Sequence, residues 1–137
     1  DSFLCLFNPA LLDFPRPISL EDYLSVPHLL TSLGDDAHGA VDEALAKLRL
    51  KRTVALVTPG FLAVPFVVAR APLITTMPLR LARYFAETFQ LATSPAPVEL
   101  PSLAISLLWH GSFDQDPGHI WLRQTISAVA AEVALGV

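Results

Sequence analysis

An alternation of short apolar runs with amphipathic, helix-like segments constrains the fold of this chain more than any other feature. The apolar runs are typical of strands, and they cover residues 3–7, 28–33, 53–57, 73–76 and 103–109. The segments between them have the spacing of helices, over residues 19–25, 38–49, 61–70 and 78–89 and from 117 onward. Strands that alternate with helices predict a parallel or mostly parallel sheet with helices on its faces, so we expect an α/β fold.

Capping signals indicate where several of these helices begin. Ser19 is suited to cap the first helix, and Asp22, three residues later, can bond back to Ser19 in a capping box. Pro78 suits the first helical position of the fourth helix, and Asp116, followed by a proline, suits the cap of the last. The 12 prolines are spread singly, which predicts many short elements, and the proline-punctuated residues 94–101 are expected to form a connection.

The composition predicts a globular unit that does not bind nucleic acid by itself. Hydrophobic residues make up 53% of the 137, enough for one core. The net charge is −4, which offers no basic field for phosphates. The one cysteine, Cys5, can form no internal disulfide, and its apolar run indicates a buried side chain in a protein from a reducing compartment.

Neither a membrane span nor a signal peptide is predicted. The longest uncharged stretch, residues 53–69, is shorter than the roughly 20 apolar residues of a span, and Pro59, Gly60 and Pro65 interrupt it. The first residues have no basic region of the kind that opens a signal peptide. We therefore expect no membrane contact and a cytoplasmic location. The chain also opens directly on an apolar run, which favours a piece of a longer protein.

No pattern of catalysis or cofactor binding is present, so we expect no enzyme, no catalytic residue, no cofactor and no metal. Residues 110–119 hold two histidines and two aspartates, but Asp116 is already needed as a helix cap, which favours a capped loop over a metal site. Ser32, Ser106 and Ser112 could serve as nucleophiles, yet none lies in a G-x-S-x-G turn. An α/β hydrolase stays an alternative.

Polar residues gather where three predicted strands end. These ends are residues 31–34, 58–61 and 75–76. In a parallel sheet all three lie at one edge, where open α/β sheets bind ligands and helix N-termini offer N–H groups to a carboxylate. Ordinary helix capping explains the same residues equally well.

The order of several segments resembles the effector-binding domain of LysR-type transcriptional regulators. The segments that carry the resemblance are ISLEDYL at 18–24, Pro27-His28, FLAVP at 61–65, LITTMP at 73–78 and Leu81-Ala82. The ending, from Leu107-Leu108-Trp109-His110 to Arg123, is similar to the branch that includes the nodulation regulators. The matches run over nearly the whole chain.

The resemblance implies a two-lobed fold like that of type II periplasmic binding proteins. Residues 1–8 would be the crossing strand, residues 9–96 the complete lobe II, and residues 97–137 the return segment of lobe I, its C-terminal part. The DNA-binding winged helix-turn-helix, its linker helix and the first half of lobe I would be missing from this chain. A solute-binding protein of a transporter, which has the same two-lobed fold, is the alternative.

The resemblance also implies a function. A small-molecule effector would bind between the lobes and shift the conformation of the regulator, which would contact DNA only through the absent N-terminal domain. Family members pair lobe I of one chain with lobe II of another, so we expect a dimer. The effector-binding residues implied for lobe II are Thr31, Ser32, Leu33, Pro59, Gly60 and Phe61. Two departures stand out: Ala69-Arg70-Ala71-Pro72 replaces a frequent glycine pair, and Gly60 replaces a frequent Ser or Thr cap.

Overall fold

The computed structural model describes residues 1–32, 34 and 38–135. The chain divides into two compact units, Asp1–Leu103 and Ala104–Val137. The first unit contains a sheet covered by helices, and the second contains a short turn followed by a long helix. Among the described residues, no helix combines the length and apolar character that a membrane crossing requires.

The sheet of the first unit is mixed rather than mostly parallel. Its strands are β1 (Phe3–Phe7), β2 (His28–Thr31), β3 (Val54–Thr58), β4 (Ile74–Pro78) and β5 (Ala92–Pro95). Across the sheet they follow the order β3-β2-β4-β1-β5. Strand β2 is parallel to β3 and β4, as expected, whereas β1 is antiparallel to both of its neighbours, β4 and β5.

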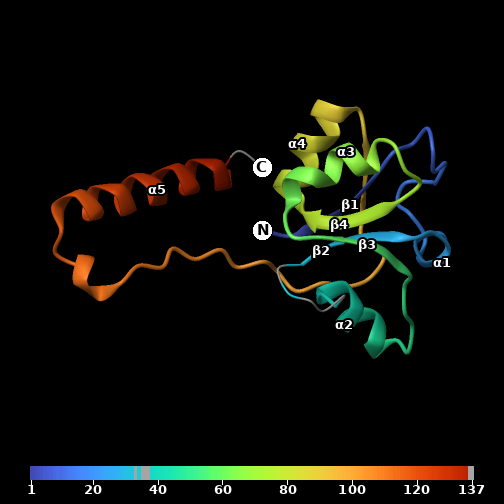
Figure 1. Ribbon diagram of the computed structural model, residues 1–137, viewed down its shortest axis with the longest axis horizontal. Coiled ribbons are helices and arrows are strands. Elements are labelled where there is room, and N and C mark those ends of the chain that lie inside the picture. Colours follow the sequence, from blue (N-terminus) through green and yellow to red (C-terminus); the bar gives the residue numbers. More distant parts are fainter. Residues whose placement is uncertain (33, 35–37, 136–137) are drawn as a thin grey trace. The chain divides into compact units, whose positions relative to one another are not determined.

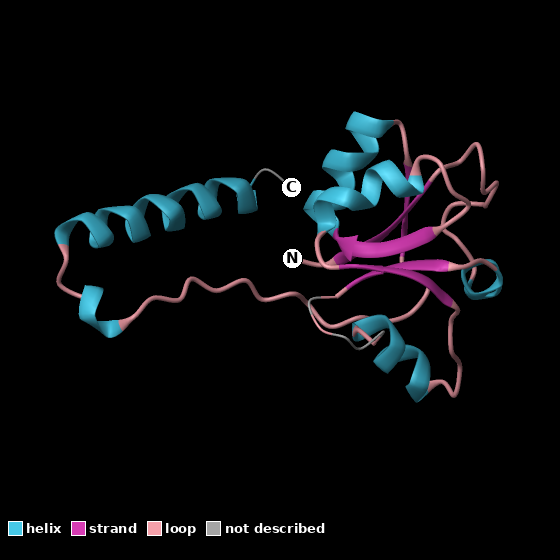
Figure 2. Cartoon of the chain, viewed as in Figure 1, coloured by secondary structure: helices cyan, strands magenta, loops and turns pink. Residues whose placement is uncertain are grey.

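Helices cover both faces of this sheet (Figures 1 and 2). They are α1 (Leu20–Ser25), α2 (Ala40–Lys47), the 3₁₀ turn η1 (Phe61–Ala63), α3 (Val64–Val68) and α4 (Leu79–Phe89). Side chains from α1 and α2 join the buried cluster on one face, and side chains from α3 and α4 join the cluster on the other. The predicted helix at 61–70 is therefore a 3₁₀ turn and a short α-helix, with Pro65 in the first turn of α3.

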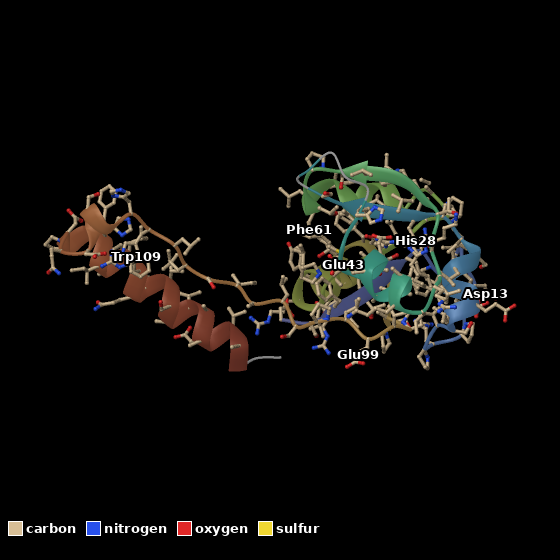
Figure 3. The ribbon with its side chains drawn as sticks, turned by 90° about the horizontal axis from the view of Figure 1, so that it is seen from below. Asp13, His28, Glu43, Phe61, Glu99 and Trp109 are labelled. Atoms are coloured by element: carbon tan, nitrogen blue, oxygen red, sulfur yellow. The ribbon has the colours of Figure 1, made fainter. Side chains whose placement is uncertain are left out.

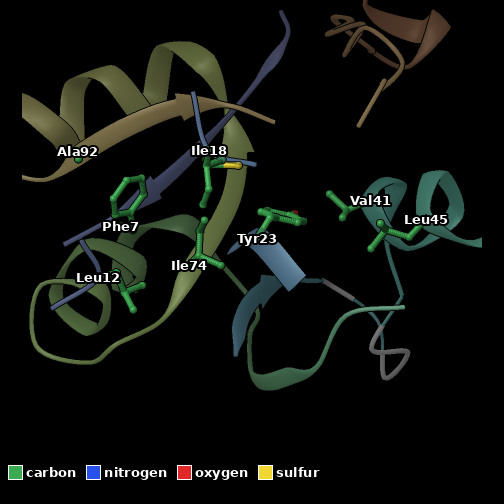
Figure 4. Packing of buried hydrophobic residues seen from close by; sticks show 9 residues of the cluster. Phe7, Leu12, Ile18, Tyr23, Val41, Leu45, Ile74 and Ala92 are labelled. Atoms are coloured by element: carbon green, nitrogen blue, oxygen red, sulfur yellow. The ribbon is translucent and has the colours of Figure 1, made fainter. Parts of the chain in front are cut away.

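Two hydrophobic clusters hold the helices to the sheet. Consecutive residues of β1 point to opposite faces, so Cys5 and Phe7 enter the cluster beside α2, and Leu6 enters the cluster beside α3 and α4. Figure 4 shows the first cluster, in which Tyr23 of α1 lies between Ile74 of β4 and the side chains of α2. Burial of the central strands on both faces explains their continuous apolar runs.

The predicted caps are confirmed at two helices and shifted at a third. The Asp22 backbone N–H donates to the Ser19 hydroxyl at 3.0 Å, and the His119 N–H donates to the Asp116 carboxylate at 2.7 Å. Pro78 is the residue before α4 rather than its first helical residue. It still pairs with Phe3 at the end of β4, and this extended backbone places the helix start one residue later.

The predicted strand at 103–109 is wrong, and a strand in the predicted connection was missed. Strand β5 (Ala92–Pro95) runs into the start of the predicted connection at 94–101, because it pairs with β1 from Leu4 to Phe7. Residues 104–110 are exposed and pair with none of the described strands. Only Leu103 makes a strand-like contact: its N–H donates to the Asp1 carbonyl, and the Asp1 ammonium donates to the Leu103 carbonyl. An apolar run without a neighbouring strand cannot form a ladder.

Local hydrogen bonds and a cation–π contact stabilise the second unit. It consists of η2 (Gly111–Phe113) and α5 (Pro117–Leu135). The indole N–H of Trp109 donates to the Asp114 carboxylate at 2.7 Å, and the Arg123 guanidinium lies 4.6 Å from the centre of the Trp109 ring. Arg123 also donates to the carbonyl groups of Phe113 and Asp114. These contacts tie the turn to the first turns of α5.

Candidate functional site

The parallel pairing of β2 and β3 brings two of the predicted strand ends together. Thr31, the last residue of β2, is the register partner of Thr58, the last residue of β3. The pairing continues one residue beyond β2, because the Ser32 N–H donates to the Thr58 carbonyl at 3.0 Å. Pro59, Gly60 and η1 follow at once, so the described predicted residues lie at one edge of the sheet. We call this the strand-end edge.

Hydroxyl groups connect the parts of the strand-end edge. The Thr58 hydroxyl donates to the Gly60 carbonyl at 3.2 Å and lies 3.4 Å from the Thr31 hydroxyl. The Ser32 hydroxyl accepts from the Gly34 N–H at 3.3 Å. Thr58 is buried, Thr31 and Ser32 are half-buried, and Gly60 is exposed. The edge thus presents neutral donors and acceptors to solvent above a buried hydroxyl.

Phe61 adds an apolar side chain to this edge. It is the first residue of η1, is half-buried, and packs against the cluster beneath α3 and α4. Gly60, which precedes it, is the N-terminal residue of the turn and has no side chain to cap it. Its φ of −158° is ordinary extended backbone, and no described atom lies within 4 Å of a Cβ built there. A larger residue therefore fits at position 60.

The prediction that Thr75 and Thr76 end the third strand is wrong. Strand β4 continues to Pro78, so Thr75 and Thr76 lie inside the strand rather than at its end. Thr75 is fully buried, and the Thr76 hydroxyl lies 2.7 Å from the Tyr23 hydroxyl. The end of β4 and the start of α4 take the place that was predicted for these two threonines. Leu33, also predicted for the site, lies outside the described residues.

A buried polar network that the sequence reasoning missed lies where β2 and β3 begin. Arg52 donates to both carboxylate oxygens of Asp42, at 2.9 and 2.8 Å. The same carboxylate accepts the Gly39 N–H at 2.8 Å, which fixes the first turn of α2. The Arg52 side chain is only 1% exposed, so this is a charge pair inside the protein. We call these residues, with His28 and Tyr23, the buried network.

His28 connects Arg52 to α1. One ring nitrogen, Nε2, lies 2.8 Å from the Tyr23 carbonyl, and the other, Nδ1, lies 3.5 Å from the Arg52 guanidinium. A carbonyl only accepts and a guanidinium only donates, so Nε2 carries the proton and the ring is neutral. Burial, together with the Arg52 charge, lowers the pKa of His28 to about 4, although the Tyr23 carbonyl and Asp42 oppose this shift.

Asp42 of the buried network and the nearby Cys5 are each held in one protonation state near neutral pH. Burial raises the pKa of the Asp42 carboxyl, but the hydrogen bonds and charge of Arg52 outweigh burial, so this pKa is lowered overall. Burial raises the pKa of the Cys5 thiol to about 12, which confirms Cys5 as a buried apolar residue rather than a reactive thiolate. The network therefore offers no group for acid, base or nucleophilic chemistry near neutral pH.

The histidines and aspartates of residues 110–119 serve local structure. Asp116 caps α5, and the His110 ring nitrogen Nδ1 accepts the Ser112 N–H at 3.2 Å. In the described part of the chain, no group of three or more His, Cys, Asp or Glu residues is arranged to hold a metal ion.

A groove elsewhere in the first unit is a poor candidate for the effector. It has a volume of about 590 Å³ and lies between α2 and residues 98–101, and Figure 3 labels Glu43 and Glu99 on its two walls. Lys47 also lines it, whereas Thr31, Thr58 and Phe61 do not.

Comparison with known proteins identifies the class. A sequence profile described as the LysR substrate binding domain matches residues 1–131. The chain is 35% identical to the HTH-type transcriptional activator NagR of a Ralstonia species over 130 residues, which are 95% of this chain and 43% of NagR. It is 32% identical to Nodulation protein D 2 of Sinorhizobium fredii over 127 residues, 92% of this chain and 41% of that protein.

A solved structure gives the same answer. The regulatory domain of MexT, a transcriptional activator in Pseudomonas aeruginosa, superposes with a TM-score of 0.78 and 31% identity, over 93% of this chain and 60% of that chain. The chain therefore belongs to the LysR substrate-binding domain family of transcriptional regulators. The resemblance to LysR-type and nodulation regulators and the predicted fold class are confirmed. The chain spans less than half the length of these curated relatives.

Proposed function

We propose that this chain senses a small-molecule effector for a LysR-type regulator at the strand-end edge. The observation that carries the proposal is the pairing of Thr31 with Thr58, which brings the polar ends of β2 and β3 and the Phe61 side chain to one place. The described residues of this site are Thr31, Ser32, Pro59, Gly60 and Phe61. Family membership supports a regulatory rather than an enzymatic role.

The chemistry of the edge favours a small aromatic or carboxylic acid. Hydroxyl and backbone N–H groups can donate to a carboxylate, and Phe61 offers an apolar surface to a ring. Benzoate combines the two features and is the simplest probe. In this proposal residues 1–8 form the crossing strand, residues 9–96 form lobe II, and residues 97–137 return to lobe I, which closes over the ligand from the other side.

The proposed mechanism is a shift between two conformations. A ligand that contacts both lobes binds the closed arrangement more tightly than the open one, and only this difference in affinity can move the equilibrium. In a regulator that dimerises through its lobes, the shift changes the spacing of DNA-binding domains placed before this chain in the full-length, cytoplasmic protein. The chain itself, with a net charge of −4, supplies no DNA contact.

Thermal unfolding of the full-length protein with benzoate and other small aromatic and carboxylic acids tests the proposal. A compound present at 100 times its dissociation constant stabilises the folded state by about 2.7 kcal/mol, enough to raise the melting temperature by several degrees. A gel-shift assay with the DNA upstream of the gene tests the regulatory part. The proposal fails if no acid raises the melting temperature and the protein does not bind that DNA.

A further inference from the structure

We propose that Thr58 is a positioning residue of the strand-end edge, which acts on the effector through Thr31 and Gly60 without touching it. This inference rests on the proposed function. Thr58 was not among the predicted binding residues, although it stands between the two groups of them in the fold. Its hydroxyl is the one described side-chain group that contacts both β2 and the residues leading into η1.

The direction of the hydrogen bonds gives Thr58 this role. A carbonyl oxygen only accepts, so the Thr58 hydroxyl donates its single proton to the Gly60 carbonyl, over 3.2 Å. The Thr31 hydroxyl, 3.4 Å away, must then be the donor toward Thr58. The Thr58 hydroxyl oxygen therefore orients both the Thr31 hydroxyl and the peptide group between Gly60 and Phe61. Both contacts are long, so their influence is on orientation more than on overall stability.

Burial separates Thr58 from the groups that can meet a ligand. Thr58 is 8% exposed, whereas Pro59 and Gly60 are exposed and Thr31 is half-buried. Without the Thr58 hydroxyl, water can replace it at the exposed Gly60 carbonyl, so the fold tolerates its loss. The Thr31 hydroxyl and the Phe61 ring then lose a fixed orientation, and a ligand must order them at a cost in affinity.

The chain offers a matched control for the loss of a buried threonine hydroxyl. Thr75 is 1% exposed on β4, in the same sheet, and among the described residues its hydroxyl has no hydrogen-bond partner. Replacement of threonine by valine keeps the shape and removes the hydroxyl at either position. Thr75→Val removes a group with no partner, and Thr58→Val removes one that orients the edge. Thr58→Ser keeps the hydroxyl and removes only a methyl group.

The experiment measures benzoate affinity and amide hydrogen exchange on the full-length protein and these three variants. Thr58→Val is expected to weaken benzoate binding five- to tenfold and to speed exchange at the Gly60 and Phe61 amides severalfold. Thr58→Ser and Thr75→Val are expected to stay within twofold of the wild type in both readouts. Recovery by serine assigns the effect to the hydroxyl rather than to packing.

Two results overturn the inference, and a third concerns only the proposed function. The inference is wrong if Thr58→Val leaves affinity and exchange unchanged, or if Thr58→Ser is as impaired as Thr58→Val. If the wild type does not bind benzoate, that result counts against the proposed ligand class. The exchange rates at Gly60 and Phe61 then decide alone whether Thr58 orders the edge.

Discussion

The two ends of the β2–β3 pair are built from opposite kinds of polar chemistry. Where the strands begin, the buried side chains of Arg52 and His28 and the half-buried Asp42 are joined by contacts that include two charged hydrogen bonds of 2.9 Å or less. Where the strands end, neutral hydroxyls meet at 3.2 and 3.4 Å and are partly open to solvent. Figure 3 labels one residue from each end, His28 and Phe61.

This difference separates anchoring from recognition. A buried charge pair is costly to open, so it holds α2 and the start of the strands in one arrangement. Weakly bonded hydroxyls can exchange their partners for a ligand at little cost, which a binding edge requires. We therefore expect changes at the buried network to alter stability, and changes at the strand-end edge to alter ligand affinity.

The largest expected effect is the loss of one partner of the charge pair. Arg52→Ala leaves the half-buried Asp42 carboxylate without its cation, and Asp42→Ala leaves the buried Arg52 guanidinium without its anion. Each is expected to lower the free energy of unfolding by about 3–5 kcal/mol. Urea unfolding measures this, with the exposed neighbour Lys51→Ala as a control that changes it by less than about 0.5 kcal/mol. A loss below about 1 kcal/mol for both single variants would show that the Arg52–Asp42 pair contributes little to the stability of the fold.

The pH dependence of stability is the next largest effect. The pKa of His28 is about 4 in the folded chain and 6.5 in an ordinary environment, so the unfolded chain takes up the proton first as the pH falls. Stability should therefore fall by about 3 kcal/mol between pH 6.5 and pH 4. The lowered pKa of Asp42 places its own loss of stability at more acidic pH. Unfolding free energies of the wild type that stay flat across that window would contradict the neutral, buried assignment of His28.

His28→Gln sharpens this test. Glutamine can still donate to the Tyr23 carbonyl but does not titrate. The variant should therefore lose the slope between pH 6.5 and pH 4 while keeping the loss of stability that Asp42 causes at lower pH. If it keeps the wild-type slope, another group is responsible for that proton uptake.

At the strand-end edge we expect smaller effects that appear in binding rather than stability. Phe61→Ala removes the apolar surface offered to a ring and should weaken benzoate binding about tenfold, or about 1.4 kcal/mol, with the fold mostly intact. Leu62→Ala is the control, because Leu62 is the next residue and its side chain is 80% exposed. Titration calorimetry measures both, and an unchanged affinity for Phe61→Ala would show that Phe61 serves only the core.

The smallest effect concerns the missing cap at position 60. A serine fits there without strain, since its Cβ meets open space and φ is extended. Gly60→Ser should raise the free energy of unfolding by a few tenths of a kcal/mol by capping η1. It also adds a hydroxyl to the edge, and thermal melts with and without benzoate separate the two consequences. Destabilisation by more than about 0.5 kcal/mol would contradict the open geometry at this residue.

Much of the fold could be predicted because the relevant signals are local. Periodicity and caps located β1, α1, α2 and α4 to within a few residues. Strand β5 was missed because Ser94 and Pro95 look like the start of a connection, and only the pairing with β1 makes residues 92–95 a strand. The buried Ser94 hydroxyl accepts the Ile18 N–H at 2.9 Å, a contact across 76 positions that no local pattern reveals. The opposite error at 103–109 has the same cause.

The polar sites also differ in how far the sequence predicts them. The strand-end edge could be predicted, because parallel strands bring their ends together whatever their side chains are. The buried network could not, because Tyr23, His28 and Asp42 lie on α1, β2 and α2, Arg52 lies in the loop before β3, and the four share no motif. Ten residues separate Asp42 from Arg52, too far for a helical pair, and only the packing of α2 on the sheet joins them.

The most direct test of the central claim is a titration of the isotope-labelled full-length protein with benzoate, followed by the backbone amide signals. If the effector binds at the strand-end edge, the largest shifts occur at Ser32, Gly60 and Phe61, while the amides of His28 and Asp42 stay near their free positions. Shifts centred on Glu43, Lys47 and Glu99 would place the ligand in the groove beside α2. That result, or the absence of any shift at the strand-end edge, would contradict the account.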